Sequence, residues 1–556
     1  MRFGHEHSTN SASVVVCSPV GIGQELPNFA ATYASAQLKS GNDQNRNVLE
    51  SIEMRIAAES KSWDLTLRIA IWLGSPVAVT GLLAGLANGM IPAGVPGEWT
   101  WSAPKTGMTM IEMIPAFLTM LTLITYSTIG ERFLTTASKR AIAVATLLPA
   151  TAVVQAGWQY AAPQGYGLAK WPIATYNSGS SGYYAKARDE IGDLAEFLRD
   201  YPKWIKKQDI LHTGTHPPGL FVEARLTLEF WRSHPAEAAK FISTMPEELR
   251  EAARAAKPGG TPVVEQASVV LLAIFRWLAS ALTVWPLWLI MRRLGHSPVN
   301  SFRTCLIWSV VPSAVLFQPA SDLLFPVLAC TAVALSLPSS EPQNWRNRYV
   351  DPVFAGLVLS FGMFFSLVFL AVGAVVAIIV AMSDVSKGIR GKCIRIGGIG
   401  AGFITGTIAW AVIGRTDPLA IWLANQTKHA GFYEAYPRSY WPWVFADFVE
   451  SAAGLGLPSA LGLAITLIAT VVRRNGLMRH RVSLASIAIL AILALSGRSL
   501  SEVGRLWLPF FPLLLTSVLA EFENFRFSGL EFRWILFWSG IQILWLQTLV
   551  QCVYPF

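Results

Sequence analysis

The chain has 556 residues, of which 53% are hydrophobic and 14% are charged. Because a soluble globular domain carries roughly 25% charged residues, this composition excludes an ordinary soluble domain and indicates a polytopic membrane protein. The net charge of +9 does not indicate a nucleic-acid partner, since the basic residues lie in short loops between apolar runs, where they orient membrane helices. The five cysteines are scattered without metal-ligand spacing, which argues against a disulfide framework.

The apolar runs predict an all-α membrane protein with about 13 transmembrane helices. Residues 1–66 are polar and mixed, so we expect a poorly ordered cytoplasmic segment there without a cleavable signal peptide. An N-terminal helical hairpin follows at 67–139, and a transmembrane body extends over 140–556. The expected spans are 68–90, 109–129, 140–156, 263–291, 304–317, 323–337, two within 353–382 broken near Ser366, 396–413, 457–472, 483–495, 506–520 and 534–550.

Most lysines and arginines of the short loops lie on one side of these spans, which places that side and the N-terminus in the cytoplasm. The basic inner loops favour a bacterial inner membrane. Four polar loops then lie on the outer side, and we expect them to meet above the helical body and form a site there. These loops are 91–108, the long insert 157–262, 415–456 and 499–505.

The long insert contains the stretch His212-Thr-Gly-Thr-His216-Pro217-Pro218-Gly219. The two prolines fix φ and remove two N–H donors, so a helix cannot continue through them. Gly219 permits a positive φ or a close backbone approach. Two imidazoles next to such a rigid turn indicate a site, in which His212 is a candidate substrate-binding residue and His216 a candidate catalytic residue.

Upstream of this turn, the period of residues 183–201 predicts an amphipathic helix with its acids on the polar face. Such a helix lies flat on the bilayer or packs on the protein, and the two interpretations are compatible. Tyr183 is a candidate substrate-binding residue at its start. Asp189 and Glu190 are its candidate acids.

The loop 415–456 interleaves aromatic and polar residues, among them His429, Tyr433, Arg438 and Tyr440. Aromatic faces stack on sugar rings and arginine binds phosphate as a fork, whereas the alternative is an aromatic belt at the membrane boundary. The polar residues interleaved with the aromatic rings favour a role in substrate binding.

Glu502 and Arg505 start an apolar run, either as a boundary ion pair or as a site for a lipid phosphate. Arg276 lies within a predicted span and needs a partner, for which Glu112, Glu265 and Asp322 are candidates.

A flat helix, then His216-Pro217-Pro218-Gly219, then an apolar segment resembles the GT-C integral-membrane glycosyltransferases, which include protein O-mannosyltransferases and lipid A sugar transferases. The resemblance covers about 140–322 by motif. It implies interfacial helices in the outer loop and transfer of a sugar from a polyprenyl-phosphate donor to a lipid, glycan or protein acceptor outside the cytoplasm. It also implies inversion by a carboxylate general base. No cofactor is indicated, and a divalent metal stays open.

The acid of that family follows the span and precedes the flat helix, but 177–182 contains no acid here. The alternative bases are Asp189, Glu190 and Glu98, which stands beside Trp99 and Trp101 in the loop 91–108. We expect the indoles to raise the pKa of Glu98, as a base requires.

Two other classes of protein remain as alternatives. A transporter or flippase for lipid-linked envelope glycans predicts paired repeats and charges at mid-membrane, and no repeat is evident. A non-catalytic assembly protein, including a degenerate relative of the family, would use the same outer loops.

Overall fold

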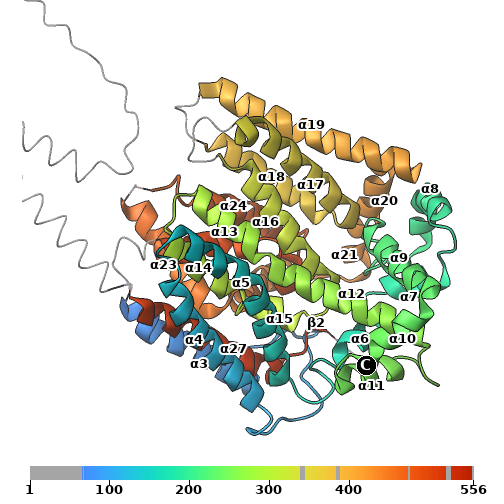
Figure 1. Cartoon of the computed structure of the whole chain (residues 1–556), viewed down its shortest axis with the longest axis horizontal. Coiled ribbons are helices and arrows are strands. Elements are labelled where there is room, and N and C mark those ends of the chain that lie inside the picture. The colour runs from blue at the N-terminus through green and yellow to red at the C-terminus, as the bar shows by residue number, and fades with distance from the viewer. Residues whose placement is uncertain are drawn as a thin grey trace, which may run out of the picture. The chain divides into compact units, whose positions relative to one another are not determined.

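The computed structural model describes residues 66, 68–338, 345–383, 388–473, 476–520 and 528–553, which belong to one compact unit, 63–556. Within these residues the chain is almost entirely helical, and the one sheet is a hairpin of β1 (Gly94–Val95) and β2 (Trp99–Thr100) (Figure 1). The all-α prediction is thereby confirmed. The predicted segment 1–66 lies, apart from Thr66, outside the described residues.

Five helices in the described part of the chain are long and apolar enough to cross a membrane. A sixth candidate joins α22 (Tyr440–Leu455) to α23 (Leu457–Arg473) through a 106° bend. Eighteen helical residues measure about 27 Å, close to the ~30 Å hydrocarbon core of a bilayer, so these lengths are compatible with a membrane protein. The five are Ala70–Ala87, Ala137–Ala161, Val263–Arg293, Arg346–Phe365 and Gly388–Gly414.

Several shorter apolar runs form helices that lie inside the protein. All residues of α15 (Pro312–Leu316) and α26 (Phe511–Val518) are buried, as is all of α14 (Pro298–Trp308) after its first two residues. A helix that is apolar on every side requires such complete burial. These elements form a protein-enclosed core, against which α16 (Phe325–Ser336) and α13 (Val284–Arg293) pack.

The run 353–382 is broken at Ser366 as predicted. α17 (Asp351–Phe365) ends there because Ser366 is extended, with φ −157° and ψ 142°, and α18 (Val368–Ala381) follows. α17 packs along α19 (Gly388–Gly414), and Figure 1 shows the two side by side.

The α17–α19 crossing depends on small residues. A Cβ on Gly402 would lie 1.9 Å from the Val353 carbonyl oxygen, and one on Gly356 would lie 2.0 Å from the Ile399 carbonyl oxygen. The two backbones are therefore in direct contact, as small residues permit in membrane helices.

The first helices pack against the last one. α3 (Ser75–Ala87) and α4 (Ile114–Arg132) both contact α27 (Gly529–Leu549), and α4 also contacts α5 (Ala137–Gly157) (Figure 1). The Gln551 N–H donates to the Ser102 carbonyl oxygen at 2.8 Å. The chain's end is thus tied to the loop 91–108, one of the four polar loops.

The long insert forms six α-helices, of which α6 (Lys170–Tyr176), α9 (Gly219–Ser233), α10 (Pro235–Ser243) and α11 (Glu247–Ala255) contact α12 (Val263–Leu282). The single amphipathic helix predicted over 183–201 is wrong, because the chain breaks at 190–193. The Asp193 side chain accepts the Glu196 N–H at 2.8 Å and starts a new helix. The other two are α7 (Tyr183–Asp189) and α8 (Leu194–Trp204).

The remaining helices connect these parts, and short helical turns separate several of them. They are α20 (Pro418–Ala430), α21 (Phe432–Ala435), α24 (Arg481–Leu495), α25 (Val503–Leu506), and the turns η2 (Ala70–Gly74), η3 (Trp158–Ala161), η4 (Ile205–Lys207), η5 (Ser321–Leu324) and η6 (Arg346–Val350).

Candidate functional site

Asp209 holds the turn that carries the two histidines. Its Oδ1 accepts the N–H groups of Leu211 (2.8 Å), His212 (2.9 Å) and Thr213 (3.3 Å), and its Oδ2 accepts the Thr213 hydroxyl. Burial acts to raise the pKa of Asp209, but these hydrogen bonds outweigh it and lower the pKa. Gly214 is required here, because a Cβ would lie 2.0 Å from the Asp209 carbonyl oxygen.

His216 is oriented through both its ring and its carbonyl. Nδ1 lies 3.1 Å from the His212 carbonyl oxygen, which can only accept, so this contact assigns the proton to Nδ1 and leaves Nε2 as the acceptor. The His216 carbonyl accepts Asn425 Nδ2 at 2.9 Å and the Tyr201 hydroxyl. The turn is therefore tied to α20 and α8, from two different polar loops.

The Pro-Pro-Gly segment starts α9 against the end of α17. Pro218 is the N-cap residue of α9. A Cβ on Gly219 would lie 2.6 Å from the Phe364 carbonyl oxygen and 2.9 Å from the Phe365 ring. Glycine thus serves close approach here rather than a positive φ.

Tyr183, at the start of α7, forms one wall of the site. Its ring meets the His216 imidazole edge to face, with centroids 5.4 Å apart, and meets the Phe221 ring in the same way at 5.3 Å. Burial raises the pKa of the Tyr183 phenol well above its ordinary value, so the phenol stays neutral at physiological pH.

The loop before α25 is held in an uncommon backbone conformation. Ser501 and Glu502 have φ of 76° and 54°, a region that non-glycine residues seldom adopt. Two carboxylates of α22 fix it: Asp447 Oδ1 accepts the Ser501 N–H at 3.1 Å, and Glu450 Oε1 accepts the Gly504 N–H at 2.9 Å. Strain maintained by buried partners often marks a functional site.

Arg505 follows this loop and pairs with Glu502, with Nη2 and Oε2 2.5 Å apart. The Nε–H of Arg505 is buried and has no hydrogen-bond partner among the described residues. The side chain therefore keeps a donor for a further ligand beside its ion pair. The sequence left open whether Glu502 and Arg505 form a boundary ion pair or a ligand site. The ion pair fits the first interpretation, and the unpartnered Nε–H of Arg505 fits the second.

Asp322 is the acid that lies beside the histidines. It is the second residue of η5, immediately before α16, and only 7% of the residue is exposed. Its charge acts on His212, His216, Tyr183 and Arg505, so it lies within electrostatic range of all four. Its carboxylate has no hydrogen bond or ion pair to any described residue. The sequence indicated Asp322 only as a candidate partner for Arg276.

The two imidazoles are neutral at physiological pH. Burial lowers the pKa of His212 to about 4, with Arg505 and His216 acting in the same direction. Burial also lowers the pKa of His216, while the Asp322 carboxylate acts against this shift. Neutral imidazoles donate and accept hydrogen bonds without adding positive charge to the cluster.

The chain matches no family model, no curated protein and no solved structure. The resemblance to GT-C enzymes therefore depends on the residues of this chain alone. Among the described residues, no three His, Cys, Asp or Glu side chains gather as a metal site.

The partner of Arg276 is Glu223 of α9, with Nη2 and Oε2 3.7 Å apart. The three partners predicted from the sequence are wrong: Glu112 accepts hydrogen bonds from Thr109, Glu265 pairs with Arg188, and Asp322 forms no ion pair with a described residue. Arg276 also donates to the Pro319 carbonyl oxygen at 3.5 Å, so it supports the segment that leads to Asp322.

Glu98 lies with the aromatic loop, apart from the histidines. It accepts the Ser439 N–H at 3.0 Å and the Trp443 indole N–H at 2.7 Å. Hydrogen bonds from Ser439, more than any other contact, lower its pKa. The raised pKa expected from its tryptophan neighbours is therefore wrong, because an indole that donates stabilises the carboxylate.

Asp189 and Glu190 already have ionic partners. Asp189 accepts both Nε and Nη2 of Arg188 at 2.7 Å. Glu190 pairs with Lys186 at 2.5 Å and accepts the Trp204 indole N–H at 3.0 Å. Both lie at the end of α7 opposite to Tyr183.

Of the remaining predicted residues, His429 lies near His216, whereas Tyr433, Arg438 and Tyr440 contact other residues. His429 lies near enough to His216 for its charge to act on the pKa of that ring. Tyr433 accepts the Leu500 N–H at 2.8 Å. Arg438 covers the Trp443 ring at 5.3 Å, and the Tyr440 hydroxyl donates to the Leu495 carbonyl oxygen at 2.6 Å. The four loops are thus linked by direct contacts, although among the described residues neither Glu98 nor Arg438 makes a hydrogen bond or ion pair with His216 or Tyr183.

Proposed function

We propose that this protein is a GT-C-like glycosyltransferase with about 13 membrane spans, acting on the outer face of a bacterial inner membrane. It transfers a sugar from a polyprenyl-phosphate donor to a lipid, glycan or protein acceptor. One observation carries this proposal above the others: the Asp322 carboxylate, which has no hydrogen bond or ion pair to a described residue, lies within electrostatic range of the His216 imidazole and the Arg505 guanidinium. Asp322 joins Glu98, Asp189 and Glu190 as a candidate base, and we favour it.

In the proposed reaction, the Asp322 carboxylate takes the proton of an acceptor hydroxyl. The hydroxyl oxygen attacks the anomeric carbon of the donor sugar as the bond from that carbon to the phosphate oxygen breaks. The bonding electron pair leaves with the phosphate, and the products are an inverted glycoside and polyprenyl phosphate. Base and leaving group lie on opposite faces of the sugar in such a displacement.

The charges around Arg505 suit this reaction. Arg505 offers its buried Nε–H to the leaving phosphate. Asp322 and Glu502 both act on Arg505, so two acids face one cation. An excess of carboxylate charge stabilises the positive charge that develops on the sugar in the transition state. His216 Nε2 is available to accept a hydrogen bond from a sugar hydroxyl.

One feature favours the transporter alternative. The bent pair α22–α23 is a broken span or a re-entrant loop, with Gly456 at φ 94° between the two helices and the buried Asp447 before it. Broken helices with buried polar residues line the substrate sites of many transporters. We rank it second because Asp447 and Glu450 are already committed to the backbone of the loop 499–505.

The test uses the full chain in proteoliposomes with undecaprenyl-phosphate mannose, glucose and arabinose, each radiolabelled in the sugar, and a membrane extract as acceptor. We expect undecaprenyl phosphate to form from at least one donor, with the label in a new glycoside, and His216→Ala to abolish both. Movement of intact donor between leaflets without release of undecaprenyl phosphate would support the transporter instead. If neither of these results is obtained, both the glycosyltransferase and the transporter functions are contradicted.

A further inference from the structure

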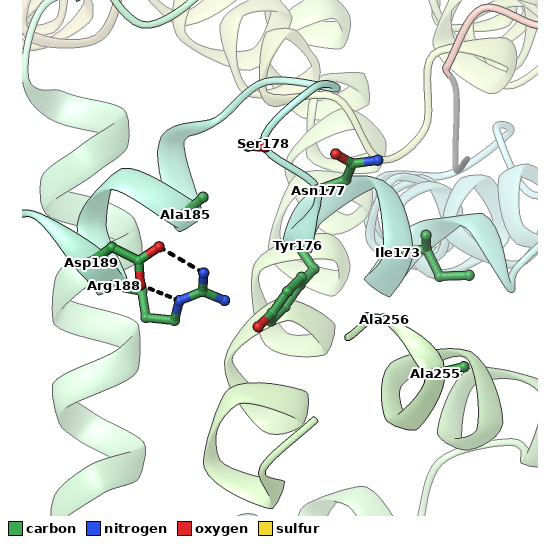
Figure 2. A pocket seen from close by; sticks show the side chains of 9 residues that line it. All are labelled: Ile173, Tyr176, Asn177, Ser178, Ala185, Arg188, Asp189, Ala255 and Ala256. Atoms are coloured by element: carbon green, nitrogen blue, oxygen red, sulfur yellow. Dashed lines mark hydrogen bonds and ion pairs between the residues drawn. The ribbon is translucent and has the colours of Figure 1, made fainter. Parts of the chain in front are cut away.

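A cavity of about 450 Å³ lies between α6, α7 and α11 (Figure 2). Its volume falls within the range of small-molecule sites, roughly 300–1,000 Å³. It opens beside Tyr176 and Asn177 at the end of α6, and Ala255 of α11 forms the opposite side. None of these three residues takes part in the cluster around His216.

The cavity and the His216 cluster share α7 as a common wall. At 3.6 residues per turn, positions 185, 188 and 189 lie roughly 140° to 240° around the helix from position 183. Tyr183 therefore contacts His216 on one side, while Arg188 and Asp189 line the cavity on the other. A ligand in the cavity lies about one helix diameter, ~10 Å, from the cluster.

The charges of the cavity disfavour an anionic ligand. Both Nε and Nη2 of Arg188 are engaged by Asp189, and Nη1 lies 3.4 Å from Glu265. The guanidinium also covers the Tyr176 ring at 4.6 Å. The guanidinium is thus shared between two carboxylates and has little capacity left to bind a phosphate.

The polar groups of the cavity both donate and accept. Asp189 is more than half exposed, so its carboxylate can accept further hydrogen bonds. The Oδ1 of Asn177 accepts the Gly179 N–H at 2.8 Å, and its amide NH₂ has no partner among the described residues. Ala185 and Ala255 add small apolar surfaces. This mixture matches the hydroxyls and C–H groups of an uncharged sugar.

We propose that this cavity binds an uncharged saccharide, which is the non-reacting part of the acceptor. The proposal of saccharide binding is argued from the cavity alone, whereas the identification of the saccharide as part of the acceptor rests on the proposed function. An extended acceptor passes around α7, so that one end is held by Asn177 and Asp189 and the reacting hydroxyl reaches Asp322.

The test measures binding by calorimetry to the purified full chain in detergent, with maltotriose, mannotriose and galactotriose as probes and inorganic phosphate as the charged probe. We expect at least one trisaccharide to bind, and Ala255→Phe and Asn177→Ala each to weaken it at least tenfold. Ala239→Phe, on an exposed position of α10, is the matched control and should bind as the wild type does. Circular dichroism and gel filtration show that each variant is folded.

Two outcomes overturn the proposal: no trisaccharide binds, or binding is unchanged in both Ala255→Phe and Asn177→Ala. Phosphate binding that Ala255→Phe removes would also overturn it. The variant His216→Ala separates the two proposals, since it should lose transfer and keep trisaccharide binding. Trisaccharide binding without any transfer by the wild type would contradict the proposed function only.

Discussion

Tyr183 and His216 meet edge to face with their ring centroids 5.4 Å apart, and this contact joins α7 to the Pro-Pro-Gly turn. The turn is held on its other sides by Asn425 and by the approach of Gly219 to Phe364. Three separate parts of the chain thus fix the position of one imidazole. A ring so confined keeps its orientation without a bound ligand, which is the condition for a pre-organised site.

Gly219→Ala is expected to destabilise the protein by about 1–3 kcal/mol, since the added Cβ forces a backbone shift against Phe364. Gly192→Ala, in the same insert, is the control, because a Cβ there has no neighbour within 4 Å. Unfolding in a graded detergent mixture, followed by circular dichroism, measures both. Equal stability of the two variants would show that the turn has room to relax.

Gly402→Ala is expected to destabilise the α17–α19 crossing by about 1–3 kcal/mol, because its Cβ would overlap the Val353 carbonyl oxygen. Gly400→Ala places a methyl group two residues away on the same helix, where no neighbour lies within 4 Å. The same unfolding measurement applies. A loss of stability in Gly400→Ala as large as that in Gly402→Ala would rule out the close backbone contact.

The stability of the protein should fall on mild acidification in part because of His212. Its pKa in the folded state is about 4, below the ordinary value of 6.5, so between these values the unfolded state binds the proton more readily. Stability from this group is complete above pH 6.5 and is lost as the pH falls towards 4. The thermal midpoint should therefore drop less between pH 7 and 5 in His212→Gln than in the wild type. Equal drops would contradict the lowered pKa.

Arg276→Met is expected to destabilise the protein by about 3–5 kcal/mol, because Glu223 would keep a buried charge without its partner. The double variant Glu223→Gln with Arg276→Met removes that charge and should recover a large part of the loss. A double-mutant cycle by detergent unfolding measures the coupling. Additive effects of the two changes would show that the pair does not interact.

Local signals in the sequence predicted much of the fold and part of the site. Ser366 interrupts an apolar run too long for one span, and the chain breaks there. The helix predicted over 183–201 was wrong because hydrophobic period alone does not reveal a cap: α7 ends at Asp189, and Asp193 caps the start of α8, while the apolar period continues across the break. Sequence periodicity also cannot separate a lipid-facing helix from an enclosed one such as α15.

Asp322 was missed as a site residue for a different reason. It follows a Pro-Ala-Ser segment and starts an apolar helix, which is a position where an intramembrane acid is a functional candidate. Its nearness to His216, however, arises from the packing of distant segments. The pKa of Glu98 likewise depends mainly on Ser439 and less on Trp443, and both are remote in the sequence. Long-range partners of this kind carry no local signal.

The central claim is that Asp322 is the base for sugar transfer, and a comparison of carboxylate variants tests it most directly. The measurement is the rate of undecaprenyl phosphate formation from the active donor by Asp322→Asn, Glu98→Gln, Asp189→Asn and Glu190→Gln, each with its folding checked. We expect Asp322→Asn to lose at least 100-fold, in keeping with removal of a general base, ~10²–10⁴-fold, and the other three to stay within about tenfold of the wild type. Full activity of Asp322→Asn, with loss in one of the others, would contradict the account.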